Sequence, residues 1–167
     1  MVHRAYISVG SNIGDPLRNC RRGIDELCLD GEVGLVAQSP FYRSQPVDYL
    51  DQDWFVNAAV LVETSLSPFE LLEKTQGIQA RMGRKSDAVR FGPRVLDLDI
   101  ILYEDAVIHT PHLVVPHPRM HKRRFVLYPI CDIDPSVVHP VLKQTVREIL
   151  EQLPADDQEL MPCSSGC

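Results

Sequence analysis

Two aspartates, Asp97 and Asp99, lie two residues apart in an otherwise apolar run that ends at Tyr103. Side chains two apart on a strand share a face, so we expect both carboxylates to project together, away from a core formed by Leu96, Leu98, Ile100 and Leu102. Aspartate is depleted in strands, and two like charges on one face repel each other unless a cation lies between them. Magnesium prefers carboxylate, water and phosphate oxygens. The pair therefore predicts a magnesium site, although two solvated aspartates on an open sheet face would also explain it.

Arginines flank this pair in the sequence. Arg84 ends the preceding predicted helix, where the helix dipole favours a cation, but Arg94 follows a rigid Gly-Pro turn three residues before Asp97. Nine of the 17 lysines and arginines fall between residues 81 and 124, in a chain whose net charge is -6. This distribution disfavours a general nucleic-acid surface and favours one anionic ligand. Carboxylates for metal beside arginines for phosphate oxygens are the arrangement that phosphoryl transfer needs.

The surrounding sequence predicts the elements that must position these residues. Capping boxes at Ser67 to Glu70 and at Thr145 to Glu148 mark two helix starts, and Asp15 with Pro16 marks another. Hydrophobic periodicity then predicts strands over 4–9, 33–42, 55–63 and 95–103, and helices over 16–28, from 68, from 123 and from 146. The order strand, helix, strand, strand, helix, strand is that of an α+β ferredoxin-like sandwich, an antiparallel sheet with helices packed on it. Many functions use this fold, so it does not decide the chemistry.

Length and composition indicate a single domain. We expect residues 1–153 to form it and the acidic end, 154–167, to be a flexible tail. No apolar run approaches the roughly 20 residues of a membrane helix. Five cysteines without metal-type spacing favour reduced thiols. The expectation is a cytoplasmic monomer that binds neither nucleic acid nor membrane.

The run from Arg90 to Tyr103 resembles the signature of the 6-hydroxymethyl-7,8-dihydropterin pyrophosphokinase family. Further family segments occur in the same order between Tyr6 and about Leu150: Gly10-Ser11-Asn12, Phe41-Tyr42-Arg43, Asn57-Ala58-Ala59, Gly83-Arg84, Val115-Pro116-His117, and Arg123 with Phe125. The resemblance implies transfer of pyrophosphate from ATP to 6-hydroxymethyl-7,8-dihydropterin, which gives AMP and the pterin diphosphate in folate biosynthesis.

The resemblance also implies a role for individual residues. Asp97 and Asp99 would bind two Mg²⁺ ions, and Arg84 and Arg94 would act both in catalysis and in ATP binding. The other implied ATP-binding residues are Gln76, Ile100, His117 and Arg123. The implied pterin-binding residues are Ser44, Gln45, Val47, Phe55, Asn57 and Phe125, although the two phenylalanines would otherwise be assigned to the core.

Some positions depart from the family pattern, and other functions remain open. Phe55, Gln79, Phe91 and Pro118 stand where tyrosine, glutamate, tryptophan and tyrosine are expected. The segment 85–91 is expected to become ordered only when ATP and pterin are both bound. One alternative is another magnesium enzyme, such as a nuclease or a nucleotide-sugar transferase. A second is a non-catalytic binding module, either regulatory or RNA-binding. An RNA-binding sheet would need exposed aromatics where this strand carries aspartates.

Overall fold

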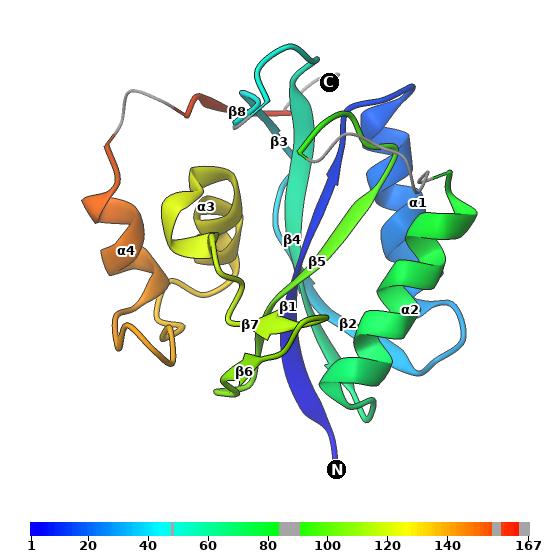
Figure 1. The fold of residues 1–167 in the computed structure, drawn as a ribbon, viewed down its shortest axis with the longest axis vertical. Coiled ribbons are helices and arrows are strands. Elements are labelled where there is room, and N and C mark those ends of the chain that lie inside the picture. The colour runs from blue at the N-terminus through cyan, green and yellow to red at the C-terminus, as the bar shows by residue number, and fades with distance from the viewer. Residues whose placement is uncertain (48, 84–90, 155–157, 164–167) are drawn as a thin grey trace.

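An antiparallel sheet lies at the centre of the computed structural model, between two pairs of helices (Figure 1). The structure describes residues 1–47, 49–83, 91–154 and 158–163. The strand order is β5-β1-β4-β3-β8, and β2 also pairs with β4. The strands of the sheet are β1 (His3–Ser11), β2 (Val33–Gln38), β3 (Tyr42–Ser44), β4 (Phe55–Thr64), β5 (Asp97–Tyr103) and β8 (Leu160–Pro162). A separate hairpin consists of β6 (Ile108–His109) and β7 (Val114–Val115).

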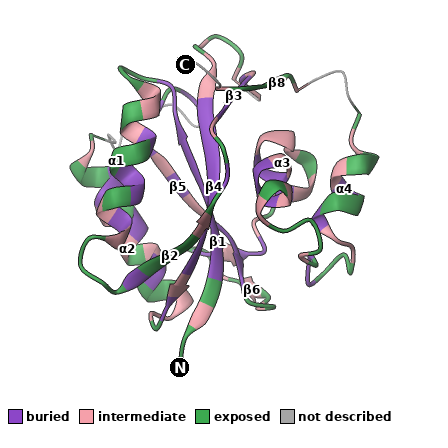
Figure 2. Cartoon of the chain, turned by 180° about the vertical axis from the view of Figure 1, so that it is seen from behind, coloured by how far each residue is buried: buried purple, intermediate pink, exposed green. Residues whose placement is uncertain are grey.

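The helices cover both faces of this sheet. The helices α1 (Pro16–Cys28) and α2 (Pro68–Arg81) pack on one face, while α3 (Arg124–Ile133) packs on the other and α4 (Val146–Gln152) packs on α3. A short 3-10 helix, η1 (Met120–Lys122), precedes α3. Buried residues gather on both faces of the sheet and on the inner sides of the helices (Figure 2). The predicted α+β ferredoxin-like sandwich is confirmed. No helix in the described part of the chain has the length and apolar character needed to cross a bilayer.

The predicted helix starts are confirmed by their capping contacts. Asp15 accepts a hydrogen bond from the backbone of Arg18, at 3.2 Å, and Pro16 occupies the first helical position of α1. Ser67 and Glu70 form the reciprocal capping box of α2. These contacts satisfy backbone N–H groups that have no partner within the helix, so a few local residues determine where each helix begins.

The strand β5 departs from the predicted alternation near its end. Tyr6 and Ile7 of β1 pair with Leu102 and Ile100, so Ile101 is an extra residue in a β-bulge. Ile100 lies in the core beneath α1 and α2, whereas Leu102 is buried in the core beneath α3. The prediction that Leu102 shares a face with the preceding core residues is therefore wrong, because the bulge reverses the faces after Ile100.

Two other segments also differ from the sequence prediction. The strand predicted over 33–42 is divided into β2 and β3 at Ser39-Pro40, where proline cannot donate a ladder hydrogen bond. Within residues 154–167, which were expected to be a flexible tail, Leu160–Pro162 forms β8 and pairs antiparallel with β3. Cys163 follows it and is disulfide-bonded, in contrast to the expected reduced thiol.

Candidate active site

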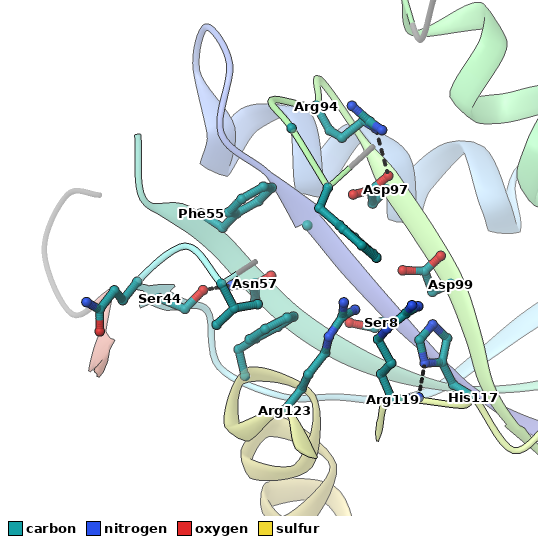
Figure 3. Close-up of a pocket in the computed structure, with 16 residues that line it drawn as sticks. Ser8, Ser44, Phe55, Asn57, Arg94, Asp97, Asp99, His117, Arg119 and Arg123 are labelled. Atoms are coloured by element: carbon teal, nitrogen blue, oxygen red, sulfur yellow. Dashed lines mark hydrogen bonds and ion pairs between the residues drawn. The ribbon is translucent and has the colours of Figure 1, made fainter. Parts of the chain in front are cut away.

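A cavity of about 290 Å³ lies on the sheet face opposite α1 and α2, next to the start of α3 (Figure 3). Its walls come from β1, β3, β4 and β5, and from the segments that precede β5 and α3. Most of the residues that the sequence predicts for the site line this cavity: Ser44, Gln45, Val47, Phe55, Asn57, Arg94, Asp97, Asp99, His117, Arg123 and Phe125.

A second cavity, of about 780 Å³, adjoins the first through three shared residues, Arg94, Asp99 and His117. It lies between α2, β5 and the segment 111–118, and it contains the two remaining predicted residues that the structure describes, Gln76 and Ile100. The predicted catalytic residue Arg84 lies outside the described residues, as does most of the segment 85–91. The structure thus brings together every predicted site residue that it describes.

The two aspartates face the cavity from the start of β5. Asp97 is opposite Gly10 of β1 and Asp99 is opposite Ser8, so only small residues lie beside them. Gly10 is required here for a second reason, since a Cβ atom would lie 2.9 Å from Oδ1 of Asn57 on β4. The bulge in β5 comes after both aspartates, so they share a face as predicted. The result is a pair of carboxylates that both line the cavity (Figure 3).

Arg94 is held over Asp97 by contacts to its own backbone. The backbone N–H of Arg94 donates to Oδ1 of Asn12 at 2.8 Å, and the backbone N–H of Asn12 donates to the carbonyl of Arg94 at 3.0 Å. The side chain is 8% exposed, with Nε 3.9 Å from Oδ1 of Asp97. A nearly buried guanidinium at this distance is positioned in advance, because it needs little rearrangement to meet a further anion.

Asn12 extends this contact to a third segment. Its Nδ2 donates to Oε1 of Gln52 at 3.0 Å and to the carbonyl of Asp53 at 2.9 Å, while Nε2 of Gln52 donates to the carbonyl of Phe91 at 2.9 Å. The sequence indicates Asn12 only as part of a family segment, and nothing in the pattern indicates Gln52. We refer to these hydrogen bonds among Asn12, Gln52 and the backbone of Arg94 as the Asn12 clasp.

The opposite end of the cavity is aromatic with a buried amide. Phe55, at the start of β4, and Phe125, in the first turn of α3, both line it. Two residues along β4 from Phe55, Nδ2 of Asn57 donates a short hydrogen bond to the hydroxyl of Ser44 on β3 (Figure 3). Asn57 is 3% exposed. Aromatic faces with a fixed amide suit a flat ring that has polar edges.

His117 lies at the junction of the two cavities. Burial, the largest effect, lowers the pKa of His117, as do the nearby cations of Arg123 and Arg119, while the carboxylate of Asp99 opposes the shift. Its Nδ1 accepts a hydrogen bond from the backbone N–H of Arg119 at 3.1 Å. The imidazole is therefore neutral near pH 7 and carries its proton on Nε2, where it can donate to an acceptor in the cavity.

Several further residues line the site without having been assigned to it from the sequence. Arg119 places its guanidinium carbon 4.7 Å from the centre of the Phe91 ring, and Arg123 lies 5.6 Å from the same ring. Arg119 belongs to the cluster of cations noted in the sequence, but its position there does not distinguish it from its solvated neighbours. Gln79, one of the departures from the family pattern, is 4% exposed and accepts a hydrogen bond from the N–H of Leu98 at 2.8 Å.

Comparison with known proteins identifies the family. A family model described as 7,8-dihydro-6-hydroxymethylpterin-pyrophosphokinase matches residues 6–135. A 2-amino-4-hydroxy-6-hydroxymethyldihydropteridine pyrophosphokinase of Methylorubrum extorquens is 42% identical over 150 residues, which is 90% of this chain and 93% of the relative. The Bacillus subtilis enzyme of the same name is 48% identical over 129 residues, 77% of each chain.

A solved structure with much lower sequence identity supports the fold. The wild-type HPPK-DHPS protein of Plasmodium falciparum superposes with a TM-score of 0.72 at 15% identity, over 90% of this chain and 44% of that protein. The likeness therefore concerns less than half of the Plasmodium protein and shows the fold alone. Together with the family model, the relatives confirm the predicted transfer of a pyrophosphoryl group to hydroxymethyldihydropterin in folate biosynthesis. This chain belongs to the 7,8-dihydro-6-hydroxymethylpterin-pyrophosphokinase family.

Proposed function

We propose that the two adjoining cavities hold the two substrates of this reaction, with ATP as a Mg²⁺-dependent donor. The observation that carries the proposal is that a carboxylate pair and Arg94 lie in one cavity with two aromatic side chains and a buried amide. ATP occupies the cavity beside α2 with its triphosphate at Asp97 and Asp99, and the pterin occupies the aromatic end. Both cavities are lined by one chain, so the reaction needs no second copy. Because the donor is ATP, we place the reaction in the cytoplasm.

Asp97 and Asp99 have the chemistry of a substrate-completed magnesium site. Among the described residues, no group of three or more histidine, cysteine, aspartate or glutamate side chains forms a metal cage. Two carboxylates alone suit Mg²⁺, which takes its other ligands from water and from substrate phosphates. Two bound Mg²⁺ ions would neutralise phosphate charge and orient the triphosphate. The aspartates supply the fixed oxygens for this arrangement.

The other residues bind and orient the reacting groups. Phe55 and Phe125 stack on the pterin ring, while the backbone of Ser44 to Val47 and the amide of Asn57 meet its polar edges. The hydroxymethyl oxygen then attacks the β-phosphorus of ATP and AMP departs. Arg94, together with Arg84, stabilises the charge that moves through the triphosphate. The remaining ATP-binding residues are Gln76, Ile100, His117 and Arg123.

An assay of AMP release tests the proposed function. The chain is incubated with ATP, Mg²⁺ and 6-hydroxymethyl-7,8-dihydropterin, and nucleotide products are separated by chromatography. We expect AMP and the pterin diphosphate in equal amounts, with no product when a chelator removes Mg²⁺. The control acceptor is 6-methyl-7,8-dihydropterin, which lacks the attacking oxygen. Release of ADP in place of AMP would mean that a single phosphoryl group is transferred and would contradict the proposal.

Arg119 is expected to contribute to binding of the triphosphate. Its cation lines the cavity, and among the described residues no ion pair joins it to a carboxylate. A triphosphate entering the cavity would provide that anion, so Arg119→Met should raise the KM for ATP about tenfold, as one lost charge-assisted hydrogen bond predicts. Lys122→Met is the matched control. Lys122 is exposed on η1, so this substitution removes the same charge outside the cavity. Equal effects of the two substitutions would show that only the general positive field matters.

A further inference from the structure

The helix α3 begins without a capping side chain of its own. Its N-cap residue is Arg123, which makes no side-chain cap hydrogen bond, and an arginine side chain has no acceptor to offer. The first turn of this helix nevertheless carries Arg123 and Phe125 into the cavity. The backbone at this point must therefore be fixed by another part of the chain.

Gln158 supplies that contact from the far end of the sequence. Its Oε1 accepts a hydrogen bond from the N–H of Arg124 at 2.7 Å, and its Nε2 donates to the carbonyl of Lys122 at 2.8 Å. The carboxamide thus binds one backbone group on each side of Arg123. It takes the place of the missing cap of α3 and gives the last carbonyl of η1 a hydrogen-bond partner.

The residues after Gln158 reach the opposite wall of the same cavity. Glu159 and Gln45 exchange hydrogen bonds, from the N–H of Gln45 to the carbonyl of Glu159 at 3.0 Å and from the N–H of Glu159 to Oε1 of Gln45 at 3.3 Å. Leu160 then pairs with Ser44 as β8 joins β3 (Figure 1). Gln45 and Ser44 both line the aromatic end of the cavity. Three consecutive residues therefore connect its two walls.

We infer that Gln158 is a positioning residue for the reaction, acting through the backbone of Arg123 to hold the Arg123 guanidinium and the Phe125 ring against the substrates. This inference rests on the proposed function, because it uses the roles given there to Arg123 and Phe125. Loss of the carboxamide leaves the N–H of Arg124 and the carbonyl of Lys122 without their partner and releases the chain around Arg123. The distance between the two cavity walls then varies, and both substrates bind less tightly.

The substitution Gln158→Met tests this inference, because it keeps the side-chain length but removes both hydrogen bonds. We expect the KM for each substrate to rise about tenfold with kcat nearly unchanged. A residue that only stabilises the fold would lower the fraction of active enzyme, which lowers the apparent kcat and leaves KM unchanged. Gln152→Met is the matched control, since it makes the same change on the exposed end of α4. Equal KM values for wild type and Gln158→Met would overturn the inference.

A double-mutant cycle with Arg123→Ala separates action through Arg123 from other effects. If Gln158 acts through Arg123, Gln158→Met should cost little further ATP affinity in the Arg123→Ala background. If the two residues acted independently, the fold losses in ATP affinity of the two single variants would multiply in the double variant. Gln158→Glu keeps the acceptor for Arg124 but loses the donor to Lys122, so it should lie between wild type and Gln158→Met. Calorimetry with Mg²⁺ gives Kd values for a non-hydrolysable ATP analogue and for the dihydropterin. These values compare the same variants without turnover. Absence of AMP release by the wild type would therefore contradict the proposed function, while the Kd values still decide the role of Gln158.

Discussion

Asp97→Asn and Asp99→Asn are each expected to lower turnover by on the order of 10³-fold while the chain remains folded. Each substitution removes one charged oxygen donor from the proposed magnesium site, whose other ligands would come from water and from substrate phosphates, and metal stabilisation of a phosphoryl transition state is worth several kcal/mol. The fold should persist because both side chains face the cavity and loss of one charge reduces repulsion within the pair. Asparagine has nearly the same shape as aspartate, and 29% of the Asp97 side chain is exposed, so the substitution leaves the packing in place.

The measurements are AMP release over a series of Mg²⁺ concentrations, and the melting temperature of the metal-free protein. Asp105→Asn serves as the control, since Asp105 is exposed just beyond the end of β5. Raising the Mg²⁺ concentration should restore part of the activity if the loss is one of metal affinity. A near-wild-type rate for Asp97→Asn would show that the metal is held elsewhere.

Arg94→Ala should reduce kcat by about 10²-fold to 10³-fold, with a much smaller change in the KM for ATP. The guanidinium is already fixed beside Asp97, so its contact with the triphosphate is expected to strengthen as charge moves toward the departing AMP. Its backbone contacts with Asn12 involve only the main chain of residue 94 and survive the substitution. Arg94→Lys should recover only part of the rate, because lysine lacks the planar fork of donors.

Steady-state kinetics with each substrate varied in turn distinguish a contribution of Arg94 to kcat from a contribution to ATP binding. Arg81→Ala is the matched control, because Arg81 forms a surface ion pair with Glu26 and its side chain is 63% exposed. Exposed pairs of this kind contribute about 1 kcal/mol or less, so activity should stay at the wild-type value. If Arg94→Ala weakened ATP binding and left kcat unaltered, Arg94 would be a ground-state binding residue and the proposed catalytic role would be wrong.

The features that the sequence predicted depend on neighbours in the chain. The starts of α1 and α2 are determined by residues within one helical turn, and both were predicted from those residues. Asp97 and Asp99 share a face because they are two apart in a regular part of β5. The residues assigned to the ATP and pterin sites rest on the family resemblance, and those that the structure describes all line the two cavities.

The features that the sequence did not predict depend on contacts between distant segments. The bulge at Ile101 arises from the pairing of β5 with β1, about ninety residues apart. The strand β8 has three residues and little apolar pattern, so its pairing with β3 cannot be read from composition. Arg119 resembles the solvated cations around it until the fold places it above Phe91.

The Asn12 clasp has a consequence for how members of this family can diverge. Asn12 and Gln52 meet through their side chains, but both of the contacts between Asn12 and residue 94 use the main chain of that residue. Replacement of Asn12 would therefore favour a compensating change at position 52, and the two positions should covary among relatives. Neither change would require a compensating change at position 94, since no side chain there takes part in the clasp. Selection on the Arg94 side chain would then come from the chemistry of the reaction, while selection on Asn12 and Gln52 would come from the hydrogen bonds of the clasp.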